Sequence, residues 1–124
     1  NPWYILIFES DTTPAAGTTY ATPVWTECAA YDEVTREAYV EAIAAGQSMT
    51  NAASKATFTM NASKTIYGAG LVGGVNGATK SDATAGAIPG LTNVCYAAAK
   101  FGSSQTVVSS DVVQITAILT SSDV

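Results

Sequence analysis

Alternating apolar and polar side chains mark the segment 56–61 as a β-strand with one buried face. Its apolar positions are Ala56, Phe58 and Met60, and its polar positions are Thr57, Thr59 and Asn61. A repeat of two residues is typical of a strand, because successive side chains point to opposite faces. Turn-favouring residues follow at 61–64, and a second β-rich run begins at Thr65. The pattern predicts that the two runs form an antiparallel hairpin.

Glycines interrupt the second run at positions 68, 70, 73 and 74. Glycine inside a strand indicates a bulge or a closely approaching backbone. Gly68 to Gly73 also spell G-x-G-x-x-G, the spacing of a dinucleotide-binding loop. That motif requires a helix directly after it, and the following Gly74-Val75-Asn76-Gly77 cannot sustain one. We therefore interpret these glycines as structural.

The N-terminal part of the chain contains a second kind of pattern, an unbroken apolar run. Trp3 to Phe8 is apolar throughout, which is typical of a strand covered on both faces. Residues 10–23 are rich in turn formers and predict a surface loop. For residues 24–45, helix propensity competes with a β interpretation. We expect an irregular stretch or a helical turn near 29–33, followed by an extended segment over 37–42.

The C-terminal half predicts further strands separated by turns. Residues 73–92 form a long loop, 93–101 a strand, 103–105 a break and 112–120 the last strand. In the last strand Val113, Ile115, Ala117 and Leu119 are expected on one face, and Val112, Gln114, Thr116, Ile118 and Thr120 on the other. Short strands at this spacing predict an all-β fold. We expect a single antiparallel β-sandwich over 1–124, with a jelly-roll as one form of it and one short helical turn at most.

Composition narrows the range of partners. The chain has 124 residues, of which 12% are charged, and its formal net charge is −5. The few basic residues are scattered, whereas nucleic-acid binding requires clustered Lys and Arg, so no nucleic-acid partner is expected. No apolar run approaches the roughly 20 residues of a membrane-spanning helix, so no membrane is expected either. Many small Ala, Thr, Ser and Gly residues favour a surface covered by neighbouring subunits.

Candidate chemistry is sparse. The chain has no histidine, which removes the commonest general base and any Cys/His zinc site. Glu33 with Glu37, or Glu37 with Glu41, would share one face if their segment were helical, but a solvated acidic face is the simpler interpretation. Cys28 and Cys95 could form one disulfide or remain two buried thiols, and we favour the thiols. We predict no catalytic, cofactor-binding or metal-binding residues, and no enzymatic activity.

Some aromatic and loop residues are candidates for contacts with a partner protein. Trp25 and Tyr31 lie in the irregular segment, where an aromatic ring is available for an interface more readily than in a strand. Long loops are commonly functional or lie over a partner, and the 73–92 loop contains Gly74, Asn76 and Lys80. These five residues are our candidate interface.

Several segments together resemble a known class of protein. They are Asn1-Pro2-Trp3-Tyr4 before an apolar strand, Thr26-Glu27-Cys28 with Tyr31-Asp32-Glu33, Ala53-Ser54-Lys55-Ala56-x-Phe58, Lys64-Thr65-Ile66-Tyr67-Gly68-Ala69, Ala99-Lys100-Phe101 and Ser110-Asp111-Val112. This set resembles small virion structural proteins of tailed bacteriophages, over most of the chain. Residues 73–92 are longer than the corresponding loop of that pattern.

The resemblance implies a compact β-sandwich that binds other virion subunits and has no active site. The expected role is a capsid decoration (cement) protein that contacts the major capsid protein, forms a homo-oligomer and is assembled in the bacterial host cytoplasm. A modest interface repeated over a symmetric shell stabilises the lattice by avidity. Three alternatives stay open: a tail or neck protein, a glycan-binding module, and a secreted pilin-like or surface-layer subunit. A Cys28–Cys95 disulfide would favour the last of these.

Overall fold

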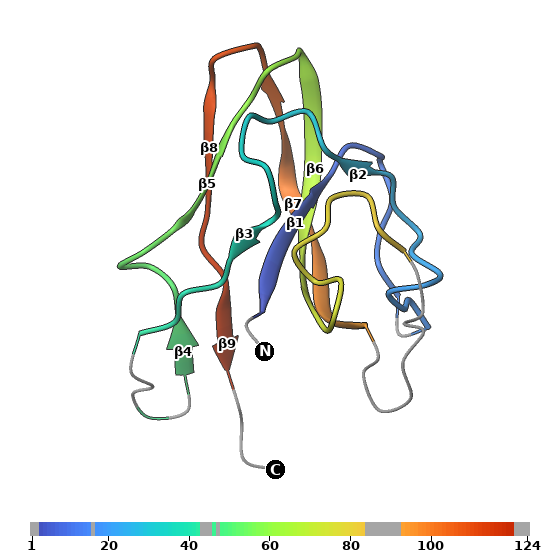
Figure 1. Cartoon of the computed structure of the whole chain (residues 1–124), viewed down its shortest axis with the longest axis vertical. Helices are drawn as coiled ribbons and strands as arrows, with labels where there is room; N and C mark the ends of the chain where they lie inside the picture. Colours follow the sequence, from blue (N-terminus) through green and yellow to red (C-terminus); the bar gives the residue numbers. More distant parts are fainter. Residues whose placement is uncertain (1–2, 16, 43–45, 47, 84–92, 121–124) are drawn as a thin grey trace.

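The computed structural model describes residues 3–15, 17–42, 46, 48–83 and 93–120, and the regular structure in this part of the chain is entirely β (Figure 1). The strands are β1 (Tyr4–Phe8), β2 (Glu27–Cys28), β3 (Glu37–Ala38), β4 (Ser48–Thr50), β5 (Ala56–Thr59), β6 (Lys64–Gly73), β7 (Val94–Val107), β8 (Val112–Ile115) and β9 (Ile118–Thr120). None of the described residues forms a helix long and apolar enough to cross a membrane. The all-β prediction is confirmed.

The strands form antiparallel sheets that pack face to face. The large sheet has the order β2-β1-β6-β7, with β3 also paired to β1, and the smaller layer consists of the pairs β5-β8 and β4-β9. The pairs β6-β7, β5-β8 and β4-β9 are nested in the sequence, as in one long hairpin folded over on itself. Figure 1 shows both crossings between the layers, β5 to β6 and β7 to β8, at the top of the molecule. This arrangement agrees with the predicted sandwich.

The predicted hairpin between residues 56–61 and the run from Thr65 is wrong. β5 pairs with β8, whereas β6 pairs with β1 and β7. The turn between β5 and β6 is hydrogen-bonded to other segments: Met60 N donates to Asp111 O, and Asn61 N donates to Ala30 O. The chain therefore changes layers at this turn, which lets both strands direct apolar side chains into the same core from opposite sides.

The apolar run at the N-terminus is buried on both faces, as predicted. Ile5, Leu6, Ile7 and Phe8 are at most 2% exposed. Ile5 and Ile7 belong to the core between the sheets, which also contains Phe58, Met60 and Ile66. Leu6 and Phe8 face the other way and are covered by the side chains of Tyr20 and Trp25. β1 thus separates two apolar clusters.

The glycines of β6 have the structural role that the sequence indicates. A Cβ at Gly68 would lie 2.2 Å from Phe8 Cζ and 2.4 Å from Ala99 O, so only glycine fits between these strands. The β6-β7 ladder changes register between Ile66 and Gly68 and again between Leu71 and Val72. The expected close neighbour and the expected bulges are both present.

Several boundaries differ from those predicted. β7 continues through 103–105, where a break was expected, because the bulge near Gly68 absorbs the extra residues without ending the pairing. The predicted strand 112–120 divides into β8 and β9. Buried Asn51 bridges the division: its Nδ2 donates to Ile115 O, and its Oδ1 accepts from Ala117 N.

The predicted division of the last strand into two faces is confirmed where the side chains are described, and the structure shows which of the two faces is buried. Val113, Ile115 and Ala117 are partly or fully buried, and Val112, Gln114, Thr116 and Ile118 are exposed. The side chains of Leu119 and Thr120 lie outside the described residues. So does most of the second half of the 73–92 loop, residues 84–92.

The segment 24–45 follows the β interpretation in the part that is described. Residues 29–33 are irregular apart from a bridge between Tyr31 and Met60, and the extended segment is limited to β3. Cys28 and Cys95 are both free thiols, which agrees with the favoured interpretation.

Candidate functional site: a closed polar network and an open seam

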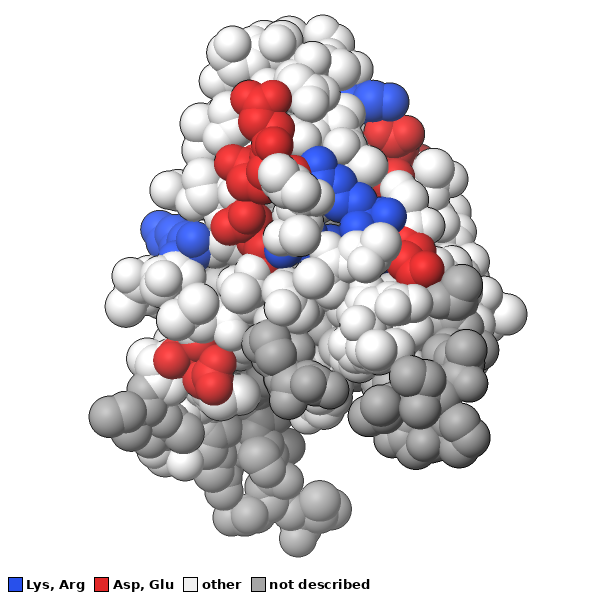
Figure 2. All heavy atoms as spheres, in the orientation of Figure 1, with Lys and Arg blue, Asp and Glu red and all other residues white. Residues whose placement is uncertain are grey.

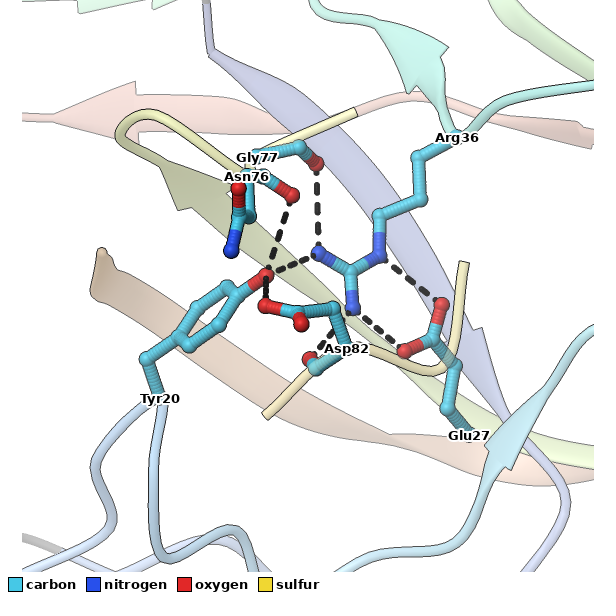
Figure 3. A network of polar contacts seen from close by, with 6 residues as sticks. All are labelled: Tyr20, Glu27, Arg36, Asn76, Gly77 and Asp82. Atoms are coloured by element: carbon cyan, nitrogen blue, oxygen red, sulfur yellow. Dashed lines mark hydrogen bonds and ion pairs between the residues drawn. The ribbon is translucent and has the colours of Figure 1, made fainter. Parts of the chain in front are cut away.

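Arg36 is the centre of the most extensive polar network in the described part of the chain (Figure 3). Its side chain is 1% exposed and extends across β1 toward the loops that follow β1 and β6. Nε donates to Glu27 Oε2 at 2.8 Å, and Nη2 donates to Glu27 Oε1 at 2.5 Å. Nη1 donates to Tyr20 Oη at 2.9 Å and to Gly77 O at 3.1 Å, and Nη2 also donates to Asp82 O at 3.0 Å. All five guanidinium N–H groups therefore have an acceptor.

The network ties three segments of the chain together. Tyr20 lies in the loop before β2, Glu27 is in β2, and Gly77 and Asp82 lie in the turns after β6. Tyr20 Oη lies 2.9 Å from Asp82 Oδ2 and 3.1 Å from Asn76 O, to one of which it can donate. The Tyr20 ring also lies under the guanidinium, 5.3 Å from its carbon. The bidentate ion pair between Arg36 and Glu27 anchors this network, which holds the loop before β2 and the turns after β6 against each other. We call the network the clamp.

The pKa shifts in the clamp indicate that Arg36 stays charged and Tyr20 stays neutral. Burial alone lowers the pKa of Arg36, but the hydrogen bonds and charge of Glu27 outweigh it and raise the pKa above its ordinary value. Burial raises the pKa of Tyr20, so this phenol stays protonated at neutral pH. A hollow of about 240 Å³ lies beside the network, lined also by Trp25 and Leu6. Because the guanidinium donors are already used inside the chain, the network acts as structure in this state.

Glu33 and Glu37, two of the acidic residues considered for catalysis, have shifted pKa values with structural causes. Glu33 accepts from Thr59 N at 2.8 Å and from Thr59 Oγ1 at 2.9 Å. Burial raises the pKa of Glu33, but hydrogen bonds from the backbone of Thr59 and of Glu33 itself, the Thr59 hydroxyl and the charge of Lys80 together outweigh it and lower the pKa. Burial first, and then the charge of Glu33, raise the pKa of Glu37. No group of three His, Cys, Asp or Glu residues within the described ranges is arranged to hold a metal ion.

The structure places Trp25 and Tyr31 in two different apolar clusters, and Gly74, Asn76 and Lys80 in the turns after β6. Trp25 is 8% exposed and stacks on Phe8 with ring centroids 5.6 Å apart. Tyr31 is 2% exposed, meets Phe58 edge to face, and lies 3.9 Å below Lys80 Nζ.

The same Lys80 Nζ donates to Tyr31 O at 2.8 Å, so this pair holds the turn after β6 to the irregular segment. Asn76 borders the Arg36 network, and its backbone N donates to Asn93 Oδ1 at 2.8 Å. Gly74 adopts φ +114°, which favours glycine. An interface role for the five stays a prediction, and the buried rings of Trp25 and Tyr31 offer little surface for it.

The surface that the sequence did not reveal is an open seam on one side of the sandwich. We use this name for the outer edge of β7, the segment Val112–Ile118, and the groove between them. The groove has two parts, of about 310 Å³ and 520 Å³. Its described lining is apolar or uncharged and includes Ala97, Ala99, Phe101, Ile115 and Ile118. In the sequence, the only hint of this seam is the run of three alanines in an otherwise ordinary strand.

Comparison with known proteins adds no relative. The chain matches no family model, no curated protein and no solved structure.

Proposed function

We propose that this chain is a non-enzymatic structural protein of a phage virion, and specifically a capsid decoration subunit that binds and stabilises the head lattice. The observation that supports the proposal best is the contrast between the two sites. The polar network uses its donors internally, whereas the open seam presents backbone edges and apolar side chains for contact with a neighbouring subunit, a second copy of this chain included. Such a surface is suited to protein contacts.

The small, uncharged side chains of the seam also support an assembly role. Ala97 and Ala99 in β7 allow a neighbouring backbone to approach closely and lose no side-chain entropy on contact. A contact of this kind is weak for one copy. Repetition over a shell makes it strong, because each bound neighbour raises the effective concentration of the next.

The proposal is tested by adding the purified chain to capsids that lack it. Binding is measured by co-sedimentation, and lattice stability by the temperature at which packaged DNA becomes accessible to dye. We expect saturable binding at regular capsid sites and a higher release temperature. A chain that neither co-sediments nor changes the release temperature overturns the proposal. Imaging of intact particles separates the head from the tail or neck alternative.

A second candidate, glycan binding, is favoured by one exposed aromatic pair. Trp3 and Tyr96 are 36% and 60% exposed, and their rings meet edge to face at 5.3 Å. Aromatic faces of this kind pack against sugar rings. A glycan array bound by the wild type, with binding abolished by Tyr96→Ala, supports this candidate. An array without signal rejects it.

A further inference from the structure

The open seam combines two unpaired strand edges on the same side of the sandwich. Among the described residues β7 pairs only with β6, and β8 pairs only with β5. Both edges border one groove, which places them side by side in different layers. Unpaired edges carry backbone N–H and C=O groups ready to bond another strand, and native proteins usually cover or protect them. Within the described ranges, β7 carries one charged residue, Lys100, which pairs with Asp11, and the bulges of the β6-β7 ladder are its other protective feature.

Charge distribution indicates what can approach this side. The chain has a net charge of −5, but between Asp82 and Asp111 its single charged residue is Lys100, and 112–118 contains none. Figure 2 shows acidic side chains gathered in a band on the face turned toward the viewer, over the region of β3 and the loop before it. Two copies that meet through their acidic faces repel each other. Two copies that meet through the seam do not.

We propose that the open seam is the contact between two copies of this chain. Since β7 and β8 lie in different layers and run in opposite directions, a two-fold axis along the strands brings β7 of each copy beside β8 of the other. Each sheet of one copy then continues, antiparallel, into the opposite layer of its partner. The two grooves merge into one apolar core, and neither copy keeps a free edge on this side.

The length shared by the two edges sets the size of this contact. The shorter edge, residues 112–118, extends about 23 Å at roughly 3.3 Å per residue, and two layers about 10 Å apart make an edge roughly 20 Å wide. The resulting area is about 460 Å² per copy, roughly half of the about 800 Å² that each partner contributes to a standard interface, so we expect a weak dimer. The contact goes beyond the proposed capsid role, because the dimer can form whatever larger assembly the chain joins.

The experiment measures the mass of the purified chain by sedimentation equilibrium between about 1 and 200 µM. The wild type is expected to dimerise within this range. Ala99→Glu and Ile118→Glu each place a carboxylate in the seam at an exposed position, so the monomer can fold, and dimerisation should weaken at least 100-fold. Val34→Glu is the matched control: this valine is 91% exposed, lies outside the seam and should leave the dimer unchanged.

Near-ultraviolet circular dichroism checks that each variant is folded, and the two seam variants are independent of each other. A wild type that stays monomeric at 200 µM overturns the inference. So does a dimer that persists in a folded seam variant, because the contact would then lie elsewhere. Capsid binding is read separately by co-sedimentation, so failure of the dimer and failure of the decoration role are distinguishable.

Discussion

The ion pair between Arg36 and Glu27 provides the sharpest energetic test of the structure. Glu27→Ala removes one partner and leaves two guanidinium N–H groups without acceptors in a site where the side chains are 1% and 8% exposed. Removing one member of a buried pair costs about 3–5 kcal/mol, because the remaining charge stays buried and uncompensated. Total stabilities of about 5–15 kcal/mol are usual for domains, so this is a large fraction.

The measurement is urea-induced unfolding followed by tryptophan fluorescence, since buried Trp25 reports the loss of the core. The control is Asp11→Ala, which removes the partner of Lys100 in an ion pair whose side chains are 64% and 37% exposed. Exposed pairs contribute about 0–1 kcal/mol, so the control should change the unfolding free energy by less than about 1 kcal/mol. Similar losses for the two variants would refute the reasoning, because water would then be compensating the guanidinium.

A double-mutant cycle extends the same test. Glu27→Ala leaves the buried guanidinium charge of Arg36 without its carboxylate partner. Combining it with Arg36→Ala removes that charge as well. The combined loss should therefore be smaller than the sum of the two single losses. Some loss should remain, because the carbonyls of Gly77 and Asp82 lose their donor. Additive losses would contradict a direct interaction between the two side chains.

Three further outcomes follow from local features. Tyr31→Phe should raise the unfolding free energy by about 1 kcal/mol in urea titrations, because the buried Tyr31 hydroxyl has no hydrogen-bond partner among the residues that the structure describes; a loss of stability would show that the hydroxyl is satisfied. Gly68→Ala should lower it by about 2 kcal/mol or more, since the new methyl group meets Phe8; an unchanged midpoint would contradict the close packing. The depressed pKa of Glu33 means that its stabilising effect is present above the unfolded-state value and is lost as the pH falls through the folded-state value. Glu33→Gln should therefore reduce the fall of the unfolding free energy below about pH 5. If the unfolding free energy of this variant falls as steeply as that of the wild type, ionised Glu33 does not contribute to the acid dependence.

Local patterns in the sequence predicted what depends on neighbouring residues. Six consecutive apolar residues were enough to identify a strand buried on both faces, and the alternation over 112–118 predicted which side chains share a face. The glycines of β6 were interpreted correctly for the same reason, since a bulge is a local event. The hairpin prediction failed because turn residues show that a chain reverses, but not which layer it enters next. That choice depends on β8, more than fifty positions away.

The polar network was missed because its members are far apart in the sequence. Arg36 meets Tyr20, Glu27, Gly77 and Asp82 only after the loops have folded over β1. One signal was available: Arg36 is the only arginine in the chain, and arginine is the residue best suited to a buried bidentate pair. Burial of Trp25 and Tyr31 could not be read from an irregular segment, because no periodicity there assigns a face.

Nested strand pairing has a consequence for how the chain reaches its structure. The innermost partners, Gly73 and Val94, are close enough along the chain to meet early, whereas Ser48 and Thr120 at the outer end are separated by most of the C-terminal half. Loop-closure entropy makes the outer contact unfavourable on its own, but each inner pair that forms shortens the loop still to be closed. The hairpin should therefore form from β6-β7 outward, with β1 joining the exposed edge of β6 afterwards. Folding then proceeds outward from β6-β7, and a nascent chain must extend through residues 118–120 before the β4-β9 pair can close.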